Sequence, residues 1–165
     1  MPPGYFSFNA TSSQTQNNIR SSGLSNANEM LTAINRFGKE IITSIYIDLV
    51  GLYGYNSFIQ NTSLGSSVDS YLISIDTGKH GIVYKTELIC LKQLIDYDGN
   101  INDIGLRTSS TNYISSSSMS SGNLQSVNSV LNNNDKLYLS TSYTYSTEQQ
   151  ITQGKFLIKL YGADI

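Results

Sequence analysis

Charge is scarce in this chain of 165 residues. Lys and Arg together number 10, and Asp and Glu number 12. Charged residues therefore make up 13% of the sequence, against roughly 25% in ordinary soluble domains. The formal net charge is −2, and a nucleic-acid-binding domain instead presents a basic surface. We expect no nucleic acid among the partners.

Cysteine and histidine each occur once, as Cys90 and His80. One cysteine excludes an internal disulfide framework, and the pair is too few for a structural zinc site of the usual kind. Cys90 lies in the apolar run Leu88–Leu91, where we predict a small buried hydrophobic residue rather than a reactive thiol. We expect no cofactor.

Long apolar runs are also absent. No uncharged apolar stretch approaches the ~18 residues that a membrane-spanning helix needs, so we expect no membrane span. Met1–Gly4 is followed by neither the basic cluster nor the apolar run of a secretory leader. The expected place of synthesis is therefore a cytoplasm.

Neutral polar residues take the place of charge, with 26 Ser, 13 Thr and 16 Asn. Residues 1–23 consist mainly of such residues and have too little apolar area to form a core, so we predict a flexible N-terminal arm. Tyr5, Phe6 and Phe8 stand near its start. Aromatic side chains bury a large area, so we expect these three to anchor the arm on a neighbouring subunit or on the domain itself.

Residues 24–165 are predicted to form a single domain that begins with one short helix. Apolar residues recur there at spacings of three and four, namely Leu24, Ala27, Met30, Leu31, Ile34 and Phe37. Asn26 and Glu29 have the spacing of a capping box, and Gly38 suits the left-handed residue that ends a helix. The spacing predicts a helix over about residues 26–37.

The period then changes to that of strands. Runs of β-branched and aromatic residues predict strands within residues 41–50, 71–75, 82–95 (one strand or two), 136–145 and 155–161. The last two are expected to pair as a terminal hairpin. Residues 107–123 are predicted to be a long surface loop, and residues 124–131 either one helical turn or the edge of a sheet.

Strands separated by polar loops, without alternating helices, predict a mainly β fold. The expected architecture is an antiparallel β-sandwich of the jelly-roll type that carries the one N-terminal helix.

An acidic segment is the one candidate metal site. Asp96, Asp98, Asn100, Asn102 and Asp103 place five side-chain oxygens within eight residues, and oxygen is the ligand that calcium prefers. The same residues are typical of a turn between strands, where their side chains bond to the backbone. We favour the turn over the calcium site.

Catalytic constellations are weak. His80 lies in a glycine-flanked turn, where we predict a solvated residue with no catalytic role. Asp48 and Glu87 lie within predicted strands, and they are either a facing acid pair or outward residues of half-exposed strands. No G-x-S-x-G nucleophile elbow is present, so we predict that the protein is not an enzyme.

Tyrosine is abundant, at 12 residues. Tyr53 and Tyr55 flank Gly54, and Tyr143 and Tyr145 share one face of a predicted strand. Rigid amphipathic rings beside Ser and Asn are typical of contact surfaces, so these four tyrosines are possible ligand contacts. The alternative is that the rings only cover the sheet.

Residues 130–162 resemble a known family. Val130–Asp135 leads into the strand residues Lys136–Leu139, and Gly154–Gly162 forms a closing strand. This arrangement is similar to the last hairpin of viral jelly-roll structural proteins of the capsid or fibre-head type. The resemblance implies a virion component, made in the host cytoplasm, whose partners are copies of itself and other virion proteins.

The function predicted from the sequence is therefore that of a non-enzymatic structural protein of a virus or phage particle, assembling through a jelly-roll domain and an N-terminal arm. The alternative is a carbohydrate- or receptor-binding β-sandwich module, whose partner is a glycan or a receptor. A β-sandwich hydrolase ranks third, since no acid–base constellation stands out.

Overall fold

Almost all regular structure in this protein is β-strand. The computed structural model describes residues 22–61, 70–99, 101–143 and 149–164. The strands are β1 (Glu29–Phe37), β2 (Glu40–Asp48), β3 (Tyr53–Tyr55), β4 (Phe58–Gln60), β5 (Ile73–Ser74), β6 (Ile82–Asp96), β7 (Asp103–Arg107), β8 (Asn112–Ser118), β9 (Leu124–Val127), β10 (Lys136–Ser140) and β11 (Gln149–Ala163). Within the described ranges the only helix is the single turn α1 (Thr77–His80).

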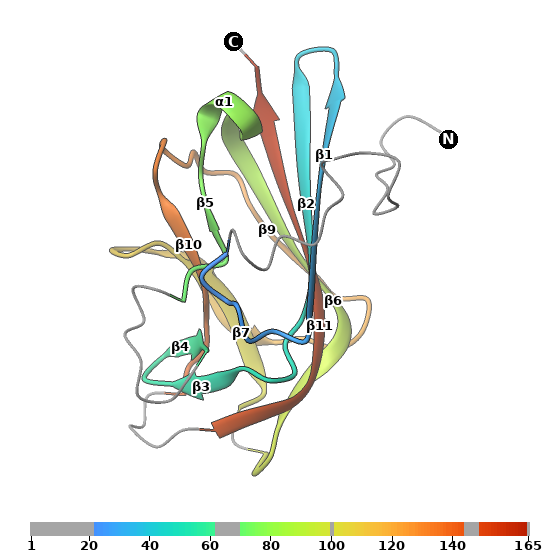
Figure 1. Cartoon of the computed structure of the whole chain (residues 1–165), viewed down its shortest axis with the longest axis vertical. Coiled ribbons are helices and arrows are strands. Elements are labelled where there is room, and N and C mark those ends of the chain that lie inside the picture. The colour runs from blue at the N-terminus through green and yellow to red at the C-terminus, as the bar shows by residue number, and fades with distance from the viewer. Residues whose placement is uncertain (1–21, 62–69, 100, 144–148, 165) are drawn as a thin grey trace.

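The strands form two layers (Figure 1). One layer has the order β1-β2-β11-β6-β9, and the other has the order β3-β4-β10-β7-β8, with β5 beside β10. β11 joins the layers, because Gln149 and Gln150 pair with β3 while the rest of the strand pairs with β2 and β6. All pairings between the described strands are antiparallel.

The pairings are nested like those of one long hairpin. β2 pairs with β11, β4 with β10, β6 with β9, and β7 with β8. This is the strand order of a jelly roll, in which the chain passes repeatedly from one sheet to the other. The predicted antiparallel sandwich is therefore confirmed, whereas the expected terminal hairpin is wrong. The winding carries β10 and β11 into opposite sheets, where each pairs with other strands.

The core lies between the two layers. Ile45, Leu88 and Phe156 come from one sheet and Leu106 and Leu139 from the other, all fully buried in a single cluster. Burying side chains of this size contributes roughly 1.5–3 kcal/mol each. The packing of apolar residues between the layers therefore holds the sandwich together.

Cys90 belongs to this core, as predicted. It is fully buried, and its Sγ donates to the backbone oxygen of Met119. Burial raises the pKa of the thiol, so the residue behaves as a small apolar side chain.

The helix predicted over residues 26–37 is wrong, because this segment contains β1. β1 pairs with β2 residue for residue, from Glu29 opposite Asp48 to Phe37 opposite Glu40. Gly38 has φ +66° and stands first in the two-residue turn between the strands, a position that favours glycine in hairpins. The glycine interpreted as a helix end is thus a hairpin turn, and pairing with β2 overrides the helical period.

Three further segments differ from expectation or resolve an open choice. The predicted surface loop over residues 107–123 contains β8, which pairs with β7 and buries Ile114. Residues 124–127 form β9 at the edge of a sheet rather than a helical turn. The apolar run at residues 82–95 is one strand, β6.

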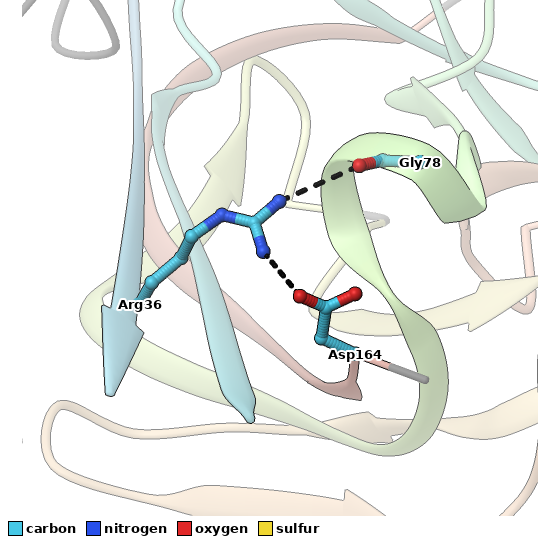
Figure 2. Close-up of polar contacts among 3 residues, drawn as sticks. All are labelled: Arg36, Gly78 and Asp164. Carbon is cyan, nitrogen blue, oxygen red and sulfur yellow. Dashed lines mark hydrogen bonds and ion pairs between the residues drawn. The ribbon is translucent and has the colours of Figure 1, made fainter. Parts of the chain in front are cut away.

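An arginine joins three elements at the end of the sandwich that carries α1. Arg36 Nη1 of β1 lies 3.0 Å from Oδ2 of Asp164, just beyond β11, and Nη2 donates to the Gly78 oxygen of α1 at 3.4 Å (Figure 2). Both charged side chains are about half exposed, where an ion pair contributes about 0–1 kcal/mol. The contact positions α1 more than it stabilises the fold.

The domain includes two residues assigned above to the arm. Ser22 Oγ and Gly23 N both donate to the Tyr71 oxygen. Residues 1–21, with the predicted anchors Tyr5, Phe6 and Phe8, lie outside the described residues. In the part that is described, no helix is long and apolar enough to span a membrane.

Candidate functional site

Three segments far apart in sequence meet at the end of the sandwich opposite α1 (Figure 1). They are β3, the turn after β6, and the start of β11. Gln149 and Gln150 pair with Gly54 and Tyr53 of β3, and the Tyr97 backbone N–H donates to the Gln150 oxygen at 2.8 Å. Backbone hydrogen bonds therefore hold the three segments side by side.

An open pocket of about 260 Å³ lies where they meet. Its lining consists of Tyr53, Tyr97, Asp98, Gln149 and Gln150. Among the described residues, two tyrosines, two glutamines and one aspartate thus line the same small space. We refer to it as the Tyr53–Tyr97 pocket.

The local chain geometry explains how β3 reaches this pocket. A Cβ on Gly54 would lie 2.0 Å from Cδ1 of Ile101, so the glycine leaves room for a buried isoleucine on one side of β3. Tyr53 and Tyr55, its neighbours, are half-buried. Because side chains alternate along a strand, the two rings lie on the side away from Ile101.

One amide lies beside two carboxylates at the base of the turn. In the orientation of the Gln149 amide that satisfies both acids, its nitrogen donates to Oδ2 of Asp96 at 3.2 Å and to Oδ2 of Asp98 at 3.1 Å. Asp96 is 2% exposed, and its Oδ1 accepts no hydrogen bond from the described residues. Gln149 is thereby fixed in place and separates two like charges.

The other residues of the predicted calcium segment point elsewhere or are not described. Asp103 Oδ1 accepts from Thr141 Oγ1 at 2.8 Å and from the Ser142 backbone N–H at 3.1 Å. Asn102 is exposed, and Asn100 lies outside the described residues. In the described ranges no three His, Cys, Asp or Glu side chains are grouped. Asp96 and Asp98 share a side-chain donor, whereas Asp103 accepts from one side chain and one backbone N–H.

Of the four predicted ligand tyrosines, the structure brings one to the pocket. Tyr53 lines it, and Tyr55 is half-buried on the same strand. Tyr143 is a core residue, 7% exposed, and Tyr145 lies outside the described residues. Sequence reasoning missed Tyr97, which is 78% exposed; an aromatic residue inside an Asp-Gly turn was the available signal.

His80 is buried, so the prediction of a solvated turn residue is wrong. It is 5% exposed, and its Nδ1 accepts from the Asp76 backbone N–H at 3.0 Å. Burial lowers the pKa of His80, an effect that the Asp76 carboxylate opposes. His80 is buried because α1 packs closely on β11: a Cβ added to Gly162 would lie 1.8 Å from the backbone oxygen of His80.

The two strand acids do not meet. Asp48 of β2 pairs with Lys155 of β11, and Glu87 of β6 pairs with Lys159 of β11. Their two partners are four residues apart on β11. Asp48 accepts from Asn28 Nδ2 at 2.9 Å, whereas Glu87 accepts from the Tyr161 hydroxyl. The facing acid pair is therefore excluded for these two residues.

A second surface is apolar and lies on β6 and β9. Leu91, Ile95 and Leu124 are 44%, 42% and 48% exposed, while Cys90 and Leu94 beside them are buried. Leu124 pairs with Ile89 of β6, which is two residues before Leu91 on that strand. We call Leu91, Ile95 and Leu124 the apolar row.

Comparison with known proteins adds no relative. No family model matches the chain, and no curated protein or solved structure is significantly similar to it. The jelly-roll order follows from the strand pairings, and the two surfaces follow from the positions of their side chains.

Proposed function

We propose that this chain is a non-enzymatic structural protein of a virus or phage particle, which assembles through its jelly-roll domain and its N-terminal arm. The observation that carries the proposal is the apolar row, where three large side chains are between 42% and 48% exposed. Apolar residues exposed together mark surfaces that contact other proteins.

The occupant we assign to the apolar row is the arm of a second copy. Residues 1–21 precede the described domain, which begins at Ser22, and they carry Tyr5, Phe6 and Phe8. An extended segment of this length spans up to about 70 Å, enough to reach a neighbouring molecule. Aromatic side chains supply the apolar area that such a surface requires.

Two general properties support assembly into a particle. Jelly rolls occur in viral capsids and also in lectins. The fold is therefore compatible with a structural role in a particle but does not distinguish it from other roles. The low charge of the chain, at 13% of residues, keeps repulsion between closely packed copies small.

The test is sedimentation velocity on the full chain and on the double variant Leu91→Thr/Ile95→Thr. We expect the unaltered chain to sediment as a multi-copy assembly and the variant to shift toward the 18.1 kDa monomer. Leu91 and Ile95 are already more than half buried, so each lost apolar contact costs roughly 0.6–1.3 kcal/mol and association should weaken about 10-fold or more. Threonine suits a strand, so the fold should persist.

Val130→Thr is the matched control, since Val130 is 57% exposed but lies outside the apolar row. It should assemble like the unaltered chain. A monomeric unaltered chain, or a double variant that assembles normally, would contradict the proposal.

A further inference from the structure

We propose that the Tyr53–Tyr97 pocket binds a neutral sugar, one pyranose ring of a glycan. The inference does not depend on the particle role, because the pocket is formed by the folded domain itself.

The two rings provide the apolar contact that a sugar needs. One face of a pyranose ring consists of C–H groups, and these pack on the electron-rich face of an aromatic side chain. Tyr97 is 78% exposed, so most of its ring is available. Tyr53 is half-buried in β3 and is held opposite Gln150 by strand pairing.

The polar lining matches hydroxyl groups rather than ions. A hydroxyl both donates and accepts, as does the side-chain amide of Gln150, and the Asp98 carboxylate accepts. No lysine or arginine is among the described residues that line the pocket, so an anionic ligand would meet only the negative charge of Asp98. The lining therefore favours a neutral polyhydroxyl ligand.

The pocket is already formed and small. Gln149 is 9% exposed and is held by the two carboxylates beside it, and Tyr97 is anchored through its backbone. Groups that are already ordered lose little entropy on binding. A volume of about 260 Å³ lies just below the roughly 300–1,000 Å³ of sites for drug-sized ligands, which suits one ring.

The experiment is saturation-transfer NMR on the full chain with the methyl glycosides of glucose, galactose, mannose and N-acetylglucosamine. This method observes the ligand, so it gives the same answer for a monomer and for a particle, and its failure is distinct from a failure to assemble. We expect saturable binding of at least one glycoside, with a dissociation constant in the millimolar range for a single ring.

Tyr97→Ala should weaken that binding about 10-fold or more, which corresponds to the loss of one ring contact. The control is Tyr84→Ala, because Tyr84 is 40% exposed on β6, the strand before the turn that holds Tyr97, but outside the pocket; the affinity of this variant should stay within about twofold of the unaltered chain. The proposal is overturned if no glycoside binds saturably, if Tyr97→Ala binds as well as the unaltered chain, or if choline or inorganic phosphate displaces the glycoside from the pocket.

Discussion

The imidazole of His80 makes the stability of the fold depend on pH. Nδ1 accepts a hydrogen bond from the Asp76 backbone N–H, so that nitrogen must be unprotonated in the native state. Burial lowers the pKa of His80; the Asp76 carboxylate raises it, and the Lys79 ammonium lowers it further. In the unfolded chain the pKa returns to about 6.5. The unfolded state therefore binds more protons than the native state at mildly acidic pH.

Stability should accordingly be highest above about pH 6.5 and should fall as the pH drops from there toward the lower native pKa of His80. The measurement is the free energy of unfolding in urea at a series of pH values from about 6.5 downward. His80→Asn retains an acceptor near the position of Nδ1 but does not titrate, so its free energy of unfolding should fall less over the same range. Parallel pH profiles for the two proteins would contradict this account of His80.

At the scale of elements, β1 and β8 show where sequence patterns fail. The apolar residues of β1 fit a helical period, yet Met30 pairs with Ile47 on the core side and Phe37 faces Glu40 across the hairpin turn. Gly38-Lys39 between two nine-residue segments was the local signal for that hairpin. β8 is rich in serine, and its strand conformation depends on the backbone bonds that β7 supplies.

β2 and β11 could be predicted because their own residues alternate. Ile45, Ile47 and Leu49 face the core, and Phe156, Ile158 and Leu160 do the same on β11. The Tyr53–Tyr97 pocket could not be predicted, since β3, the turn after β6 and the start of β11 meet only through the jelly-roll winding. Local pattern therefore identifies strands whose apolar residues alternate, and long-range pairing decides which loops share a site.

Adding calcium distinguishes between a structural turn and a calcium site at the turn after β6. Asp96 and Asp98 share the Gln149 amide, and Asp103 accepts from Thr141, so each of the three carboxylates has at least one donor from the protein. We expect millimolar calcium to leave the unfolding temperature unchanged relative to magnesium, as measured by differential scanning calorimetry.

A calcium site would behave differently. An ion that binds only the native state at ten times its dissociation constant adds about 1.4 kcal/mol, which raises the unfolding temperature by several degrees. Such a rise with calcium, abolished in Asp98→Asn, would establish the metal site instead of the turn.

At the scale of the whole molecule, the two candidate surfaces adjoin, because Ile95 of the apolar row lies two residues before Tyr97 of the pocket. The Tyr53–Tyr97 pocket gathers loops at one end of the sandwich, whereas the apolar row lies along β6 and β9. An occupant bound along the apolar row therefore lies beside the pocket.

The measurement that tests the central claim most directly is the native mass of the full chain beside that of a chain lacking residues 1–21. Ser22 and Gly23, which bond to Tyr71, remain in the shortened chain, so its far-UV circular dichroism should keep the strand signal. The account predicts a multi-copy mass for the full chain and a mass near the monomer for the shortened one. A full chain that is monomeric at 18.1 kDa, or a shortened chain that assembles equally well, would contradict it.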